Sequence, residues 1–499
     1  MTSSTTLEDL PPELFEVFAS HLPLHATPQA LLSLALVNWR ISTIVLPLIN
    51  SCIVLRYKTD AAKMIQKILE DPTLGLAVRE LHMMTDSSPG TSNGCKLSDI
   101  VGGLQDAIDR GLLAHLHTLG LELLGEGKLR NGFFKNLRSK CPRLKGFLLD
   151  NVGDTWGDHW LDETGMEEIK DLTSLELIFP IECVEEEGKL DKVQKYLGTL
   201  TGTLHTLSLS KDFDMIHASH LFTLEFPYLR SLRLCNFNVD DTTVAMNFWN
   251  RHPSLEFIEC TIGSQNFFDK TFTLNFLPNL RHLKAEFCDV LTLAPMLHRL
   301  VSLEIYCIYN AQLPYLLQSV LPGGLPDLKS LYFDQLPSSE ANTDLTVNAE
   351  GLWYETEEWK SGKFETQKKM EDMSIFDGYM PSIVRGAPNL EELAIHGLLN
   401  KFSSLSSFEF IGSSLRALSR LQRVYLSAPA VEDDIFLSGS HILAEKCKNL
   451  ELVTNTTASI WPYRNARISR SSTGDVENIT MGRGFGTQIG KENQPFPRP

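Results

Sequence analysis

The sequence lacks the motifs that would assign it to a common class of enzyme or membrane protein. Its nine cysteines are scattered and no two form a C-x-x-C pair, so neither a structural zinc site nor a redox motif is predicted. No run of 18 apolar residues occurs, and residues 1–8 lack the charged and apolar segments of a secretion signal. G-x-S-x-G, H-E-x-x-H and P-loop patterns are also missing. We therefore expect a cytosolic or nuclear protein with reduced thiols, without a membrane span, catalytic residues, metal site or cofactor.

The sequence is also poor in positive charge. Lys and Arg number 45 against 62 Asp and Glu, which gives a formal net charge of −17. A protein that binds DNA or RNA neutralises phosphates with clustered basic side chains, so nucleic acid is disfavoured as a partner. The 43% hydrophobic content predicts a substantial core.

One phrase recurs through most of the chain: an anchor Leu followed by apolar residues three and five positions later. Successive anchors from Leu116 to Leu328 lie 20 to 32 residues apart, and the next anchor, Leu390, follows after 62 residues. The period and the L-x-x-L-x-L pattern are typical of leucine-rich repeats. The long step indicates either two long repeats or one repeat with an insertion. The copies begin at Val78, Leu116, Leu144, Leu172, Leu204, Leu229, Leu255, Leu280, Leu300, Leu328, Leu390, Leu421 and Cys447.

Proline marks the same place in six copies, two residues before the anchor. Proline has no backbone N–H and clashes with the preceding turn, so it ends a helix. Residues 241–251, which precede Pro253, read as such a helix. The repeated unit is therefore predicted to be a helix, a stop and a short strand, and stacked units bury one continuous core. The six prolines are Pro142, Pro227, Pro253, Pro278, Pro326 and Pro388.

Residues 7–50 do not follow the repeat and are predicted to form a small helical module. Leu10, Leu14, Phe18 and neighbouring apolar residues recur at helical spacing, and Thr27-Pro28 reads as the start of a second helix. A segment this short cannot bury all of these apolar side chains in a core of its own. The side chains that remain must pack on a partner or on the repeats.

The module resembles an F-box. The similarity is carried by Leu10-Pro11-Pro12-Glu13-Leu14, by Leu22-Pro23 and by Leu31-Leu32-Ser33-Leu34-Ala35-Leu36-Val37-Asn38-Trp39-Arg40. The resemblance implies that Leu10, Pro11, Leu14, Leu36 and Val37 lie at or beside an interface with the Skp adaptor, and through it a cullin. An F-box before leucine-rich repeats is the domain order of the leucine-rich F-box family, and the Pro-x-Leu phrase resembles fungal members.

The fold is thus predicted to be α/β: a helical F-box, then a leucine-rich-repeat solenoid over residues 51–463 with a curved parallel sheet inside and helices outside. Strand residues between the buried leucines would point to the concave face. Their mixture of both charges with tyrosine suits a protein partner, although any solvated face carries polar residues. The predicted substrate-binding residues are Arg233, Lys284, Glu304, Tyr306, Tyr332 and Tyr425.

Three other segments stand apart. Residues 1–6 and 464–499 are polar and predicted to be disordered, and residues 337–386 form a charged insert. Lys491-Glu492-Asn493 resembles a KEN degron. Asp150, Asp154, Asp158 and Asp162 could gather around a cation, but the glycines between them favour a solvated acidic loop.

These observations predict a non-catalytic substrate receptor of a Skp–cullin–F-box ubiquitin ligase. A leucine-rich scaffold without a ligase role, in which the module only caps the first repeat, is the alternative. An enzyme with an active site hidden in the repeats is a third hypothesis, for which the sequence offers no set of reactive residues.

Overall fold

The structure is a computed structural model, and its strands and helices fall into two units, Met1–Leu255 and Glu256–Pro495. The residues that it describes are 10–21, 27–55, 58–84, 96–122, 129–150, 164–179, 189–211, 216–217, 219–239, 241–261, 267–269, 271–273, 275–308, 324–335, 380–396, 405–426, 431–456 and 463–484. The predicted N-terminal disorder, most of the insert, the KEN-like tripeptide and Asp154, Asp158 and Asp162 lie outside these residues.

The first unit begins with three helices and continues as alternating strands and helices. The opening helices are α1 (Pro12–His21), α2 (Thr27–Ala35) and α3 (Trp39–Ile49). The strands that follow are β1 (Cys52–Leu55), β2 (Glu80–Met84), β3 (Thr118–Glu122), β4 (Gly146–Asp150), β5 (Ser174–Phe179), β6 (Thr206–Lys211), β7 (Ile216–His217), β8 (Ser231–Cys235) and β9 (Phe237–Asn238). Between them lie α4 (Lys58–Glu70), α5 (Pro72–Ala77), α6 (Leu97–Asp109), α7 (Phe133–Lys140), η2 (Met166–Glu168), α9 (Lys189–Leu200) and η4 (Leu221–Thr223), and α10 (Thr242–Arg251) follows β9.

The second unit repeats the same alternation and ends in an antiparallel hairpin. Its strands are β10 (Phe257–Thr261), β11 (His282–Glu286), β12 (Ser302–Ile308), β13 (Ser330–Gln335), β14 (Glu392–His396), β15 (Arg423–Leu426), β16 (Leu452–Asn455), β17 (Tyr463–Arg470) and β18 (Val476–Gly484). Its helices are α11 (Phe287–Thr292), η5 (Ala294–Arg299), α17 (Met380–Gly386), α18 (Leu405–Leu415) and α19 (Asp433–Lys446).

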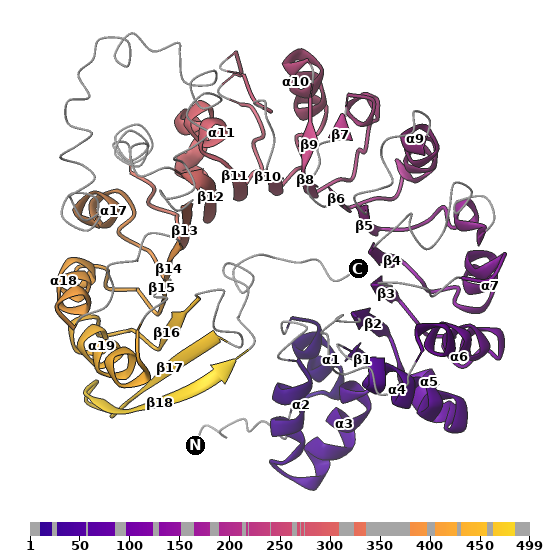
Figure 1. Ribbon diagram of the computed structural model, residues 1–499, viewed down its shortest axis with the longest axis horizontal. Helices are drawn as coiled ribbons and strands as arrows, with labels where there is room; N and C mark the ends of the chain where they lie inside the picture. Colours follow the sequence, from indigo (N-terminus) through magenta and orange to yellow (C-terminus); the bar gives the residue numbers. More distant parts are fainter. Residues whose placement is uncertain are drawn as a thin grey trace, which may run out of the picture. The chain divides into compact units, whose positions relative to one another are not determined.

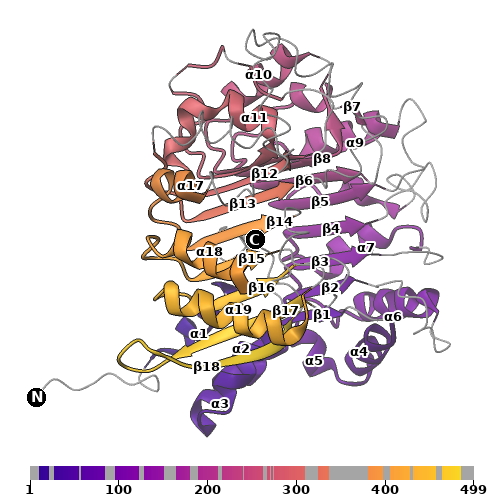
Figure 2. The ribbon, with the colours of Figure 1, turned by 60° about the vertical axis from the view of Figure 1, so that its left-hand side comes forward.

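Within each unit the long strands are parallel and follow one another in chain order. In the first unit the order is β1-β2-β3-β4-β5-β6-β8, and in the second it runs from β10 to β16 before β17 and β18 turn antiparallel. The helices of each unit lie on one side of its strands (Figures 1 and 2). We call the other side of the strands the open face.

The core lies between the strands and the helices and is built by the predicted repeat. The second position of the phrase is in register from strand to strand, as in Leu119, Phe147 and Leu175, and all three are buried. Leu283, Leu303 and Leu331 form the same buried row in the second unit. Stacking therefore hides leucines that no single repeat could bury, which confirms the predicted α/β repeat fold.

The structure decides the long step between Leu328 and Leu390. Strands β13 and β14 pair directly, from Ser330 opposite Glu392 to Asp334 opposite His396. No further strand of the sheet lies between them, so the step is one repeat that carries an insertion.

The prediction of disorder from residue 464 onward is wrong for residues 464–484, which belong to β17 and β18. Ala466 and Ile468 in β17 are buried. The guanidinium of Arg470 donates to the carbonyls of Ala444 and Cys447 at 2.8 and 2.9 Å, so it satisfies the carboxyl end of α19. The arginines that made the segment look disordered are in part structural.

Candidate protein-binding surfaces

The N-terminal module has a small core of its own. Phe15 from α1, Leu31 from α2 and Ile41 and Val45 from α3 are buried against one another. Asn38 begins α3, because its side chain accepts the backbone N–H of Ile41 at 2.8 Å, as expected of a helix N-cap. The cap holds the turn between α2 and α3 in a defined conformation.

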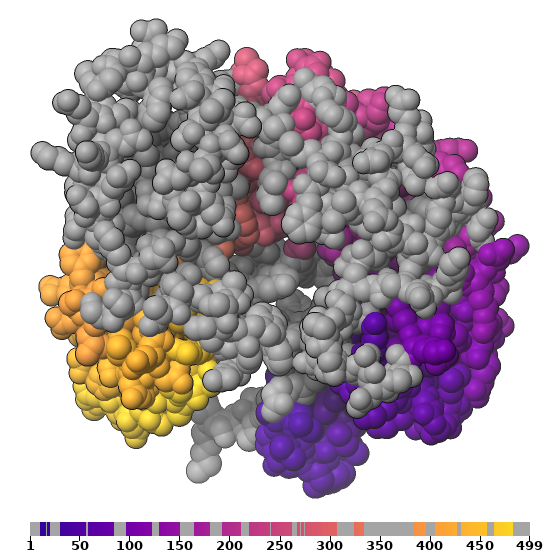
Figure 3. All heavy atoms as spheres, viewed as in Figure 1, coloured from indigo at the N-terminus to yellow at the C-terminus, as the bar shows by residue number. Residues whose placement is uncertain are grey.

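That turn and the outer sides of the helices carry an unusual amount of exposed apolar surface. Leu36 is 79% exposed, Val37 59% and Trp39 81%. The other large apolar side chains of the module that are exposed are Leu14, Val17, Phe18, Leu32 and Leu46. The helices of the module reach the surface in Figure 3. Clustered exposed apolar side chains mark an interaction site in a folded protein.

The residues predicted to bind the adaptor lie in two places of this module. Leu36 and Val37 are in the α2–α3 turn, whereas Pro11 and Leu14 are exposed at the start of α1 and Leu10 is half-buried against the small core. Trp39 is not among the predicted residues, although it is the most exposed. Trp39 lies at the start of an amphipathic helix but outside the apolar face of that helix. This position in the sequence could have predicted that its side chain is exposed.

On the open face of the second unit, one row of side chains carries both charge signs. Glu259, Lys284 and Glu304 are opposite one another on β10, β11 and β12. The Lys284 ammonium lies 2.7 Å from a Glu259 carboxylate oxygen and 3.7 Å from one of Glu304. It also lies 4.8 Å from the ring centre of Tyr306, within range of a cation–π contact. Two carboxylates thus share one ammonium.

The same row continues into an aromatic cluster that differs from the exposed surface we predicted. Tyr332 and Tyr425 are only 9% and 2% exposed and pack with Ala394, and Tyr306 packs against them. Glu304 is also buried. Among the predicted substrate-binding residues of this unit, only Lys284 and Tyr306 are half-exposed. Alternation along the strands gave the correct face but could not tell which side chains on it are covered.

Arg233 belongs to the first unit, on β8, where it lies opposite Ser208 of β6 and is half-buried. Whether the six predicted residues bind a substrate stays a prediction.

A second charged row on the open face links three strands of the second unit. The Ser330 hydroxyl donates to a Glu392 carboxylate oxygen at 2.7 Å, and the Nε of Arg423 lies 3.5 Å from the other oxygen. Glu392 is buried, so its charge is matched by Arg423 and by the serine. The contacts of this row connect β13, β14 and β15 and so stabilise the sheet.

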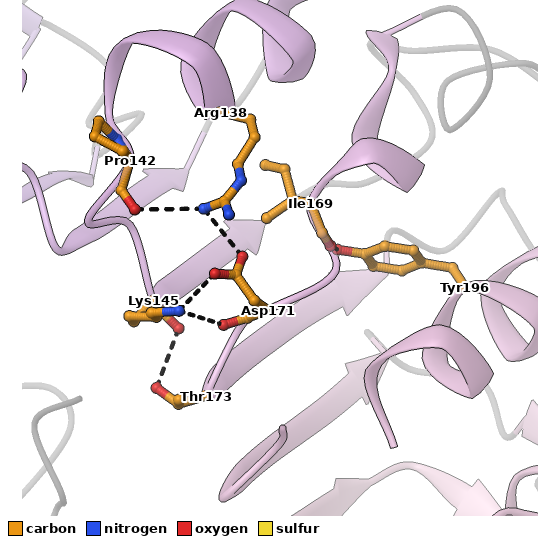
Figure 4. A network of polar contacts seen from close by, with 7 residues as sticks. All are labelled: Arg138, Pro142, Lys145, Ile169, Asp171, Thr173 and Tyr196. Atoms are coloured by element: carbon orange, nitrogen blue, oxygen red, sulfur yellow. Dashed lines mark hydrogen bonds and ion pairs between the residues drawn. The ribbon is translucent and has the colours of Figure 1, made fainter. Parts of the chain in front are cut away.

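On the helix side of the first unit, one carboxylate joins neighbouring repeats (Figure 4). Asp171 lies 3.0 Å from the Arg138 guanidinium and 2.5 Å from the Lys145 ammonium. Partial burial raises the pKa of Asp171, but the hydrogen bond from Lys145 and the charges of Arg138 and Lys145 outweigh it, so its pKa is lowered. Asp171 is therefore ionised at neutral pH and acts as a structural brace.

Within the residues that the structure describes, no group of three or more His, Cys, Asp or Glu side chains is placed to hold a metal ion. None of the described helices combines the length and the apolar composition that crossing a bilayer requires.

No family model matches the sequence, and no curated protein matches it. Among solved structures, a leucine-rich-repeat protein of Leptospira interrogans is 13% identical over 77% of this chain and 91% of its own, with a TM-score of 0.32. A chain of the yeast Rad7 and Elc1 complex is 15% identical over 89% and 87%, with a TM-score of 0.39. A leucine-rich-repeat protein of Legionella pneumophila is 14% identical over 64% and 86%, with a TM-score of 0.34.

The repeated helix and strand, the rows of buried leucines and the parallel register decide the architecture. The fold is that of leucine-rich-repeat proteins. In such a fold the side chains on the open face and on the terminal elements are available to partners, so the module and the open face are the candidate binding surfaces.

Proposed function

We propose that this leucine-rich-repeat protein is a non-catalytic substrate receptor of a Skp–cullin–F-box ubiquitin ligase. The helices α1–α3 bind the Skp-type adaptor, and through it the cullin, while the open face of the repeats binds a protein substrate. The observation that carries the proposal is the exposed apolar cluster of Leu36, Val37 and Trp39 at the α2–α3 turn.

The cluster fits a protein partner better than it fits a capping role. A cap on the first repeat would bury its apolar side chains against the strands, but those of the α2–α3 turn face solvent. Aromatic and aliphatic anchors of this kind dominate the energy of protein interfaces. The resemblance of residues 10–40 to an F-box supplies the identity of the partner.

The geometry also suits a receptor that holds a substrate for another enzyme. Helix α3 ends only a few residues before β1, and the Ser51 carbonyl accepts the backbone N–H groups of Arg79 and Glu80 at 2.8 Å. The module is therefore continuous with the first repeats. A substrate on the repeats would be kept near the ligase, and ubiquitin transfer would be accelerated by proximity.

The alternative is a leucine-rich scaffold without a ligase role, and the direct connection between α3 and β1 is the observation that favours it. A scaffold could use the module as an N-terminal end of the repeat array, which repeat proteins need for solubility. The two hypotheses differ in whether the full chain recruits a cullin through the adaptor.

The test is a binding measurement between the full chain and a purified Skp-type adaptor, alone and with a cullin. In the variant Leu36→Asp/Trp39→Asp we expect the affinity to fall at least about a hundredfold, because two central apolar anchors are replaced by charge. The matched control is Leu76→Asp in α5, which changes a side chain that is also exposed, at 41%, but lies outside the module. It should bind as the unmodified chain does.

Adaptor binding without cullin recruitment would favour the scaffold. No binding of the adaptor by the unmodified full chain would refute the receptor hypothesis. Equal loss in the Leu76→Asp control would show that the effect is not specific to the module.

A further inference from the structure

In the first unit, the residues that directly precede the strands form a row that is rich in basic side chains. The backbone N–H of His117 donates to the Arg79 carbonyl at 2.6 Å, and that of Lys145 donates to the His117 carbonyl at 2.8 Å. The same bond, again at 2.8 Å, links His205 to Thr173 and Arg230 to His205. In sheet order from β2 to β8 the row reads Arg79, His117, Lys145, Thr173, His205 and Arg230. We call this row the basic rim.

Stacking of the repeats gathers the basic rim from distant parts of the chain. Its successive residues lie 25 to 38 positions apart in the sequence, so no dense run of Lys or Arg announces it. Residues that are neighbours on adjacent parallel strands project to the same side. Five side chains of Arg, Lys or His therefore share one border of the first unit.

The cations of the basic rim are accessible and are only partly neutralised. Arg79 is half-exposed, and Arg143, which lies two residues before Lys145, is exposed. Within the part of the chain that the structure describes, neither arginine takes part in an ion pair. The Asp171 carboxylate faces two cations at once, Arg138 and Lys145 (Figure 4). It therefore cannot neutralise both of them.

The pKa of His117 shows that these positive charges act on the same place. Partial burial lowers this pKa, and the charges of Arg79, Arg143 and His115 lower it further. The three basic groups come from the residues before β2, β3 and β4. A positive potential is therefore concentrated here, in a chain whose formal net charge is −17.

The spacing of the charges favours an extended acidic peptide over a single phosphate group. Adjacent strands lie about 4.8 Å apart, so the basic rim extends over roughly 24 Å. An extended peptide of about seven residues has that length. A phosphate group is bound by donors that converge on one point, whereas these cations are distributed along a line. A nucleic acid, with its dense negative charge, would be repelled at longer range by the net charge of the chain.

One end of the basic rim also offers an aromatic contact. Tyr228, two residues before Arg230, is 57% exposed, and the centre of its ring lies 6.1 Å from that of His205. Tyrosine is enriched in protein interfaces because it combines a large apolar surface with a polar group. An apolar side chain of the bound peptide can pack on it.

We propose that the basic rim of the first unit, together with Arg143 and Tyr228, binds an extended acidic segment of a protein partner. Asp or Glu side chains of the segment lie along the rim, and an apolar residue packs on Tyr228. This surface is separate from helices α1–α3, so its binding does not require an adaptor. Because the attraction is between exposed charges, the binding is weakened by salt.

The test is fluorescence anisotropy of the full chain with a labelled peptide of about nine residues, in which Glu alternates with Ser around one central Leu. The peptide should bind at low salt, and its counterpart with Gln in place of every Glu should not. The variant Arg79→Glu/Arg143→Glu should weaken binding at least about tenfold, because two attractions become repulsions. The matched control is Lys63→Glu/Lys67→Glu, which makes the same change of net charge at two exposed lysines of α4. It should bind the peptide within about twofold of the unmodified chain.

Asp171→Asn supplies a variant with the opposite sign. It removes the carboxylate that Arg138 and Lys145 share, so these two cations become available to the peptide. We expect the peptide to bind roughly two- to fivefold more tightly. A variant that merely loses its fold would not gain affinity.

Circular dichroism verifies the fold of each variant, and Arg79→Gln/Arg143→Gln repeats the test if the charge-reversed variant unfolds. No binding of the Glu peptide by the unmodified chain, or an equal loss in the lysine control, would overturn the proposal. Tighter binding of a peptide with one phosphoserine and no other acidic residue would also overturn it, since the site would then be a phosphate site. Tighter binding of a short oligothymidylate would overturn it in favour of a nucleic acid.

Discussion

Several buried polar side chains tie one repeat to the next by bonding to its backbone. The Phe226 N–H donates to Nε2 of His252 at 2.8 Å, and the Cys141 thiol donates to the Leu113 carbonyl at 3.1 Å. The Tyr196 hydroxyl reaches the Ile169 carbonyl in the same way, at 3.1 Å. The partners lie 26 to 28 residues apart, which is about one repeat. Each of these side chains satisfies a buried backbone group that a leucine would leave unpaired.

His282 is the residue with the clearest consequence for pH dependence. It is 5% exposed at the start of β11, and burial, together with the charge of Arg281, lowers its pKa to about 4. In the unfolded chain its pKa returns to about 6.5. The folded state binds this proton less readily, so the stabilisation is complete above pH 6.5 and is lost as the pH falls toward 4.

We therefore expect His282→Gln to have a flatter pH profile of stability than the unmodified chain. Between pH 7 and pH 4 the unmodified chain should lose roughly 3 kcal/mol more of its free energy of unfolding than the variant does. Urea denaturation at a series of pH values measures the difference. His298→Gln, which changes an exposed histidine of the same unit, is the control. Parallel profiles for the unmodified chain and His282→Gln would contradict the assignment.

At the scale of elements, the sequence predicts strands better than it predicts the surfaces around them. The helix expected over residues 241–251 is α10, Thr242–Arg251, and Pro142, Pro253 and Pro388 follow the ends of α7, α10 and α17. These elements are predictable because the spacing of apolar residues and the position of proline both determine the local backbone conformation.

The hairpin of β17 and β18 was not predicted because the polar composition of residues 464–484 indicated disorder, although their apolar residues alternate as in strands. Ala466 and Ile468 on β17 and Ile479 and Met481 on β18 alternate with polar residues as strand residues do, but the residues that flank these two short runs are arginine, asparagine, serine and glycine. Gly474, with φ of +89°, lies in the turn. The burial of Tyr332 and Tyr425 could not be predicted either, since it depends on contacts between distant strands. The exposure of Trp39 likewise depends on how three helices pack.

Two adjacent glycines of α6 allow a test of how closely helices of neighbouring repeats approach. A Cβ on Gly103 would lie 2.6 Å from Cγ2 of the buried Ile65 in α4, whereas one on Gly102 would meet nothing nearer than 4.0 Å, at Arg130. We expect Gly103→Ala to destabilise the protein by about 1–3 kcal/mol through overpacking. Gly102→Ala should stabilise it by about 0.5–1 kcal/mol, because alanine favours the helix.

Thermal or urea unfolding of the two glycine variants measures both effects. Opposite signs are the expected result, and the pair is matched because the same methyl group is added one residue apart. A neutral Gly103→Ala would mean that α4 and α6 lie farther apart than the structure places them.

At the scale of the whole molecule, stability in a repeat protein is a sum of local terms, since each repeat contacts only its neighbours. The reactivity of a buried cysteine can report the stability of the repeats around it. Cys141 in the first unit is fully buried, and burial raises the pKa of its thiol to about 12. Cys447 in the second unit is 2% exposed, and burial raises its pKa to about 11 although the charge of Arg470 opposes the shift. The reactive thiolate is therefore scarce in both folded units.

In the native protein at pH 8 we expect both thiols to be alkylated at least several hundredfold more slowly than a free cysteine. As urea rises, each should become reactive when its own repeats open. Gly103→Ala weakens the packing of α6, which contacts α7, and Cys141 follows α7 directly. The variant should therefore lower the urea concentration at which Cys141 is labelled and change that of Cys447 much less. Mass spectrometry of the labelled peptides measures the two midpoints in one sample, and equal shifts at both cysteines would show that stability is shared over the whole chain instead of being held repeat by repeat.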